Sequence, residues 1–261
     1  TLMDLGIAGK HAIVCASSKG LGRACAISLA RNGVWVVING RDQAALDATA
    51  RDIEKECDVG VTPVRADIGT PEGQRALLDA CPNPDILINN NGGPPFKDFR
   101  ELDRDAMLAG VIMNMITPIE LVQKVIGGMV ERRFGRIVNI TSVSVKMPIP
   151  GLDLSSAARA GLTSFLAGVA PKVAEHNVTI NNILPGFFLT DRHNATFRQA
   201  MEERGISLEE AIAERAEAVP AKRFGDPAEF GDACAFLCAA QAGYITGQNL
   251  LIDGGRFPGA F

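Results

Sequence analysis

Residues Cys15-Ala16-Ser17-Ser18-Lys19-Gly20-Leu21-Gly22 join an apolar run, His11 to Ala16, to a helical run of small residues, Gly20 to Arg31. Gly20 and Gly22 lack a Cβ, so the backbone can turn sharply here and approach an anion. A helix that starts at this point directs its unpaired N–H groups and its positive dipole end at that anion. The stretch therefore predicts a phosphate-binding turn, with the hydroxyls of Ser17 and Ser18 as further donors. Plain turn chemistry between a strand and a helix is the alternative.

The chain has 261 residues, of which 47% are hydrophobic, so it can bury a sizeable core, and we expect residues 1–261 to form a single domain. Its formal net charge of −4 and the lack of a Lys/Arg-rich run argue against a nucleic-acid surface. No uninterrupted apolar run approaches the roughly 20 residues of a membrane span, and the first residues lack a signal pattern. We therefore expect a cytoplasmic protein without a membrane partner. Cys234 and Cys238 share a helical face but have no histidine near them, so no metal site is predicted.

Short apolar runs rich in β-forming residues alternate with segments long enough for a helix. These runs are His11–Ala16, Val34–Asn39, Val61–Arg65, Ile86–Asn89, Arg136–Ile140, Thr179–Leu184 and Asn249–Ile252. Their nearly continuous apolar character is typical of strands covered by helices on both faces. With right-handed crossovers, the pattern predicts an α/β fold with a Rossmann-type, doubly wound sheet of seven parallel strands. Ligands bind such sheets at the carboxyl ends of the strands.

The spacing Ala16-x-x-x-Gly20-x-Gly22 resembles the cofactor turn of short-chain dehydrogenases/reductases, which usually have Thr-Gly where this chain has Cys15-Ala16. We expect Ala16 to keep a negative φ, which would narrow the turn rather than abolish it. Other matching segments are Asn89–Gly93, Arg136–Ser142, Asn182–Thr190, Arg223–Pro227, Tyr244–Gly247 and Asp253–Gly255. The resemblance covers about Leu5 to Gly255 and is strongest to 3-oxoacyl-[acyl-carrier-protein] reductases. It implies a homotetramer or homodimer, with the helices Asp103–Met115 and Ser155–Glu175 at the interfaces.

The resemblance also implies a nicotinamide cofactor. A carboxylate after the second strand would select the free ribose of NAD, but the family's register places Gly40 there, flanked by Arg41 and Lys19. NADP is therefore favoured over NAD, although Arg41 also fits a solvated loop charge. Asp67 matches the family's aspartate at the adenine ring, and a helix cap near Thr70 is its alternative role. The implied cofactor-binding residues are Ser17, Ser18, Lys19, Gly20, Leu21, Gly22, Arg41, Asp67, Asn90, Gly92, Arg159, Pro185, Gly186 and Thr190.

The catalytic residues depart from the family pattern. Ser142 corresponds to the serine whose hydroxyl donates to a substrate carbonyl oxygen. Asn114 matches the asparagine that positions a water for proton relay, although a polar residue here can also cap a kink. The family's tyrosine lies 13 residues after the serine in close relatives, and its lysine four residues later; these positions hold Ser155 and Arg159. A serine is a much weaker acid than a phenol, whose reference pKa is about 10, and an arginine stays charged.

Other side chains would then have to supply a proton. His193, Asp153 and Lys146 are the candidates, and His193 is chemically the best of them because a histidine titrates near neutral pH. It lies in the charged, helix-forming segment 191–219, where Ser207 to Glu210 can start a helix. We expect this segment to form a substrate lid. A surface hairpin, with His193 as a solvated loop residue, is the alternative.

Three functions remain open from the sequence. The favoured one is an NADP-dependent oxidoreductase that reduces a ketone or 3-oxoacyl carbonyl by hydride transfer, with a non-standard proton donor. The second is a non-redox lyase or hydrolase that uses Ser142, Ser155 and Arg159 as an oxyanion site. The third is a catalytically silent NADP-binding protein.

Overall fold

The structure is a computed structural model that describes residues 4–190, 197–198 and 201–260. In this part of the chain a single sheet of seven strands has the order β3-β2-β1-β4-β5-β6-β7, and all neighbours are parallel. The predicted sheet is therefore confirmed. The strands are β1 (His11–Val14), β2 (Trp35–Gly40), β3 (Val61–Arg65), β4 (Ile86–Asn89), β5 (Gly135–Ile140), β6 (Val178–Pro185) and β7 (Asn249–Ile252).

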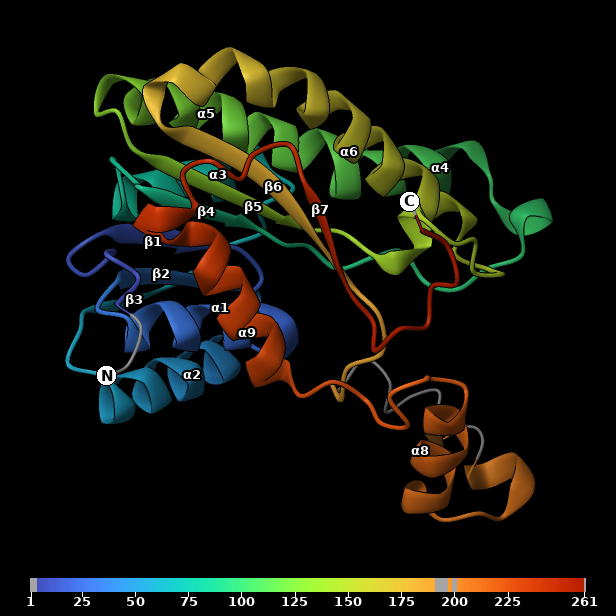
Figure 1. The fold of residues 1–261 in the computed structure, drawn as a ribbon. Helices are drawn as coiled ribbons and strands as arrows, with labels where there is room; N and C mark the ends of the chain where they lie inside the picture. Colours follow the sequence, from blue (N-terminus) through green and yellow to red (C-terminus); the bar gives the residue numbers. More distant parts are fainter. Residues whose placement is uncertain (1–3, 191–196, 199–200, 261) are drawn as a thin grey trace.

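Helices cover both faces of the sheet (Figure 1). One layer contains α1 (Gly20–Arg31), α2 (Gln43–Glu56) and α9 (Pro227–Cys238). The opposite layer contains α3 (Pro71–Ala80), α4 (Arg104–Val111), α5 (Thr117–Glu131) and α6 (Asp153–Val173). Helix α8 (Leu208–Glu217) projects beyond the carboxyl ends of β6 and β7, away from both layers (Figure 1).

Successive side chains of a strand point to opposite faces of the sheet, so each face has its own hydrophobic core. In β1, Ala12 and Val14 lie in the core beneath α1 and α9, whereas Ile13 lies in the core beneath α5 and α6. A strand buried on both faces needs apolar residues at every position, which is why the apolar runs of the sequence were continuous.

One continuous helical run, Arg104–Glu131, is long and apolar enough to cross a membrane by length and composition. It consists of α4, a π-helical turn (Ile112–Ile116) and α5. Leu121, Val125 and Met129 of this run are buried against the sheet. One side of the run thus packs on the sheet, and 39% of its most apolar window is buried inside the fold.

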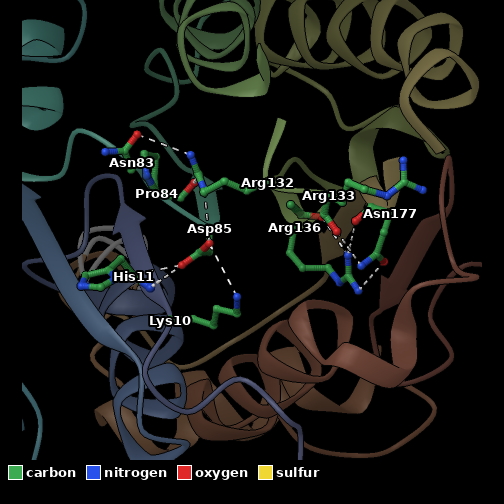
Figure 2. A network of polar contacts seen from close by, with 10 residues as sticks. Lys10, His11, Asn83, Pro84, Asp85, Arg132, Arg133, Arg136 and Asn177 are labelled. Carbon is green, nitrogen blue, oxygen red and sulfur yellow. Dashed lines mark hydrogen bonds and ion pairs between the residues drawn. The ribbon is translucent and has the colours of Figure 1, made fainter. Parts of the chain in front are cut away.

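Two polar clusters lie at the amino ends of the strands, where Figure 2 shows them side by side. In the first, the carboxylate of Asp85 accepts a hydrogen bond from the His11 backbone N–H at 3.1 Å. The Lys10 Nζ lies 3.8 Å and the Arg132 Nε 3.7 Å from the same carboxylate. Asp85 thereby ties the start of β4 to the start of β1 and to the loop before β5.

The second cluster surrounds Arg136 of β5, whose side chain is fully buried. Its Nε donates to the Ala239 carbonyl at 3.1 Å, and its Nη1 donates to the Asn177 carbonyl at 2.8 Å. The guanidinium carbon lies 4.4 Å from the ring centre of Phe134. Burial lowers the pKa of this guanidinium, and carbonyl oxygens supply the hydrogen bonds that water would otherwise give it.

The turn after β1 differs from the prediction at Ala16. Its φ is +45°, in the left-handed region where a Cβ crowds the backbone, and not negative as expected. The Ala16 N–H donates to the Asn39 Oδ1 at 3.2 Å, and its carbonyl accepts from the Asn90 Nδ2 at 3.1 Å. Two side chains from neighbouring strands thus hold Ala16 in a conformation that glycine adopts more readily. For this reason β1 ends at Val14 and not at Ala16.

We predict that Ala16→Gly raises the free energy of unfolding by about 1 kcal/mol, because it relieves the left-handed backbone strain. Urea unfolding of the two proteins measures the difference. Ala48→Gly, at an exposed position within α2, is the matched control and should lower the free energy of unfolding by about 1 kcal/mol. A loss of stability in both variants would contradict the assigned strain.

Candidate active site

A cleft of about 400 Å³ opens at the carboxyl ends of the central strands. Segments that follow β1, β4, β5 and β6 meet there, as expected for a doubly wound sheet. The sequence-predicted residues that line the cleft are Lys19, Gly20, Leu21, Asn90, Gly92, Ser142, Ser155, Arg159, Pro185, Gly186 and Thr190.

The turn into α1 is shaped to receive an anion. Gly20 has a φ of +59°, and a Cβ on Gly22 would collide with the Ala16 carbonyl, so both glycines are required by the backbone path. Lys19 precedes the helix without a side-chain cap. The first N–H groups of α1 therefore remain available to a ligand such as a phosphate.

The two serines of this turn do not behave alike. Ser17 is fully buried; its Oγ donates to the Val14 carbonyl at 2.7 Å and accepts from the Asn39 N–H at 2.9 Å. The structure thus places the Ser17 hydroxyl inside the fold and not on the cleft, contrary to the predicted contact with a cofactor. Ser18 instead packs against Gly40: a Cβ on Gly40 would lie 2.7 Å from the Ser18 Oγ. A carboxylate side chain at position 40 would therefore need Ser18 to move.

Of the charged residues near the turn, Lys19 lines the cleft, whereas Arg41 and Asp67 do not. Arg41 is exposed, and the Lys19 Nζ lies 3.7 Å from a carboxylate oxygen of Asp42. Asp67 is also on the surface, where its Oδ1 accepts from the Gly69 N–H at 2.9 Å. Thr70, and not Asp67, caps α3, so the alternative of a helix cap at Asp67 is wrong.

Four asparagines form a ladder across β4 to β7, which the sequence interpretation missed. Asn89, Asn139, Asn182 and Asn249 lie opposite one another in register on β4 to β7. The amide of Asn89 donates to Asn139 at 2.9 Å, Asn139 donates to Asn182 at 3.0 Å, and Asn182 donates to Asn249 at 2.8 Å. Each of these four strands carries a ladder asparagine among apolar residues, and that repetition was the available signal.

Asn114 lies in the π-helical turn between α4 and α5, a distortion that often marks functional positions. Its Nδ2 donates to the Gly92 carbonyl at 2.9 Å. The Asn114 Oδ1, the Asn89 Oδ1 and the Thr117 Oγ1 are buried without a hydrogen-bond partner in the described structure. All three residues line a small cavity of about 10 Å³ that also touches Arg159. Such a cavity has polar partners and roughly the volume that one water requires.

Ser142, Ser155 and Arg159 converge on the inner wall of the cleft. The Ser142 Oγ accepts from the Ser144 N–H at 3.0 Å, and the Ser155 Oγ accepts from the Arg159 Nε at 3.2 Å. Both hydroxyl hydrogens are therefore free to donate toward the cleft. Arg159 is buried, and its two Nη atoms donate to the carbonyls of Ile140 at 2.8 Å and Asn91 at 3.3 Å. The arginine thus joins the ends of β4 and β5 while it polarises Ser155.

Two of the three alternative proton donors, Asp153 and Lys146, are not brought to this wall. Asp153 is exposed in the first turn of α6, and the Lys146 Nζ lies 5.5 Å from the ring centre of Phe257. Neither lines the cleft. His193 lies outside the described residues, as does part of the predicted lid. In the described remainder, Ser207 and Glu210 form the predicted capping box of α8.

Two arginines that the sequence did not single out also line the cleft, Arg215 of α8 and Arg256 after β7. They flank the ring of Phe187. Cys15 is buried, and burial raises the pKa of its thiol to about 12. This thiol is therefore neutral and contributes no charge to the site.

Comparisons with known proteins agree with this geometry. The sequence matches the family model described as Enoyl-(Acyl carrier protein) reductase over residues 15–256. It is 32% identical to the 3-oxoacyl-[acyl-carrier-protein] reductase FabG of Vibrio harveyi, over 97% of this chain and 99% of that protein. It is 30% identical to the NADPH-dependent reductase BacG of Bacillus subtilis, over 94% of this chain and 97% of that protein. The crystal structure of L-sorbose reductase from Gluconobacter frateurii, complexed with NADPH and L-sorbose, has a TM-score of 0.94 at 29% identity and covers 98% of this chain and 100% of that one.

Proposed function

The chain belongs to the short-chain dehydrogenase/reductase family, and we propose that it is an NADP-dependent reductase of a small-molecule ketone or 3-oxoacyl compound. The observation that carries the proposal is the pair of serine hydroxyls that line the same cleft as the anion-binding turn. Relatives named as NADPH-dependent or solved with NADPH support the cofactor. FabG and L-sorbose reductase support an oxo substrate.

The residues of the cleft fit a reduction without a phenol. The cofactor, when bound, would supply a hydride to the carbonyl carbon. Negative charge then develops on the carbonyl oxygen, and the O–H groups of Ser142 and Ser155 would donate to it. Arg159, through its hydrogen bond to Ser155, strengthens that second donor because a cation polarises the hydroxyl. Neither serine nor arginine is an acid at ordinary pH, so we propose that water in the cleft supplies the proton.

The small cavity beside Asn114 has room for a second, ordered water next to the cleft. We propose that Asn114 holds one water between Arg159 and the end of β4, since three buried oxygens there lack a protein partner. We further propose that α8, which belongs to the expected substrate lid 191–219, covers the substrate end of the cleft. Its Arg215 lines the cleft wall.

Assembly is proposed from an exposed apolar surface, which we call the α4–α6 face. It comprises Met107, Leu108, Ile112, Ile116 and Phe165, each between 41% and 50% exposed. Unpaired side chains of this size on adjacent elements are typical of a surface that another copy covers. The face coincides with the helices expected to form a homodimer or homotetramer.

We predict that Ser142→Ala lowers kcat/KM for ketone reduction roughly 10²-fold, by analogy with the loss of one oxyanion donor. Ser155→Ala should lower it less, by about 10-fold, because water can replace this hydroxyl. Absorbance of NADPH during turnover measures both. The control is Ser156→Ala, whose Oγ donates to the Leu152 carbonyl at 2.8 Å outside the cleft. Loss of all turnover in Ser155→Ala, together with ester cleavage by the unchanged protein without NADPH, would instead favour the non-redox function.

Cofactor preference gives a second prediction. Arg41→Ala and Lys19→Ala should each weaken NADPH binding by about 10-fold, because each removes a charged contact to the ribose phosphate, while NADH binding changes little. Fluorescence titration with both cofactors measures this, and Arg51→Ala, an exposed arginine on α2, is the control. Equal affinity of the unchanged protein for NADH and NADPH would refute the preference.

A third prediction concerns assembly. Light scattering at micromolar concentration should give a dimer or tetramer mass, and Leu108→Glu with Phe165→Glu should lower it, because charges on the α4–α6 face oppose its burial. Leu208→Glu, at an exposed leucine of α8, should leave the mass unchanged. A monomer mass for the unchanged protein would show that the face packs against no other copy.

A further inference from the structure

Two cations lie against one aromatic ring in the cleft. The guanidinium carbon of Arg256 lies 4.1 Å from the ring centre of Phe187, and that of Arg215 lies 5.0 Å from it. Arg215 comes from the last turn of α8, and Arg256 follows β7. Two segments far apart in the sequence therefore bring like charges to the same wall.

Neither of these charges has a carboxylate within ion-pair distance in the described structure. The Arg256 Nη1 is buried without a hydrogen-bond partner, and no described carboxylate forms an ion pair with either arginine. The nearby acids are engaged elsewhere: Glu214 with Arg204, Glu217 with Lys222, and Asp253 with the N–H groups of Gly255 and Phe257.

Two neighbouring guanidiniums are unfavourable in free energy unless an anion binds between them. Burial, and next the charge of Arg215, lower the pKa of Arg256, and the carboxylate of Asp253 offsets only part of this effect. The surroundings of Arg256 therefore disfavour the cation on balance. A buried N–H without an acceptor adds a further penalty. An anion between the two guanidiniums would remove both costs with charge-assisted hydrogen bonds.

We propose that Arg215 and Arg256 form an anion subsite that binds a carboxylate or phosphate group of the substrate. This inference rests on the proposed function, because the group that binds here would be part of the reductase's substrate. The binding of the anion itself can be measured without the reaction. Phe187 directly follows Pro185 and Gly186, which resemble the family's segment beside the nicotinamide. The anion-binding turn, Lys19 to Gly22, follows β1 at the start of α1 and would serve the cofactor. The arginines are therefore assigned to the substrate and not to the cofactor phosphates.

The test measures binding apart from turnover. The protein loaded with oxidised NADP, which cannot reduce a ketone, is titrated calorimetrically with 2-, 4- and 5-oxohexanoate, with their methyl esters, and with oxoalkyl phosphates of matching length. At least one acid or phosphate should bind about 10-fold or more tightly than its neutral counterpart. The better of the two anionic series identifies whether the group is a carboxylate or a phosphate.

Variants then assign the preference to these residues. Arg256→Met should weaken anion binding about 10- to 100-fold and leave ester binding unchanged, while Arg256→Lys should retain part of the affinity because it keeps the charge. Arg215→Met should weaken it about 10-fold. The control is Arg204→Met, in the same segment but paired with Glu214 on the surface, and it should bind anions like the unchanged protein.

The outcomes separate the two proposals. Equal binding of acids, phosphates and esters by the unchanged protein overturns the subsite, and so does a loss of NADPH affinity in Arg256→Met, which would assign the arginine to the cofactor. Anion preference without reduction of any oxo compound by NADPH leaves the subsite standing and overturns the reductase function.

Discussion

The amide ladder across β4 to β7 is the interaction on which the site depends. Parallel strands are joined by long crossovers, so no tight turn sets their register, and a slip of one residue would invert every side chain. Asn89, Asn139 and Asn182 each donate to the next asparagine across the sheet, which aligns their dipoles and lets each bond reinforce the next. The segments that follow these four strands carry Asn90, Ser142, Phe187 and Arg256. Fixing the register of the strands therefore fixes where the segments that line the cleft begin.

Arg159 stands where the family resemblance leads us to expect a lysine, and an arginine does more for the structure at this position. Its planar fork donates to the Ile140 and Asn91 carbonyls while its Nε reaches Ser155. A lysine has one nitrogen and cannot reach three acceptors placed this way. The arginine thus connects the ends of two strands and polarises the hydroxyl of Ser155. At a site without a phenol, that hydroxyl can still donate a hydrogen bond.

The sheet was predictable because burial on both faces demands continuous apolar runs, and most of the proposed cofactor and catalytic positions followed from local motifs around those strand ends. The conformation of Ala16 was not predictable, because it is held by Asn39 and Asn90, which are distant in sequence. Ser17 was assigned to a ligand for a similar reason: nothing local shows that its hydroxyl is engaged by Val14 and Asn39. Arg215 and Arg256 come from segments that only the folded chain brings together, so neither carried a sequence signal.

The buried Arg136 has a consequence for the order in which the protein is made. Its guanidinium sits near the middle of the chain, but the Ala239 and Ala240 carbonyls that accept from it lie more than 100 residues later. During synthesis from the amino terminus, β5 leaves the ribosome well before those acceptors exist. Gly135 and Asn177 supply acceptors earlier, but burial of a charged group is costly while any of its acceptors is missing. The burial of Arg136 is therefore complete only when the last part of the chain arrives. Completion of the core is thereby tied to completion of translation.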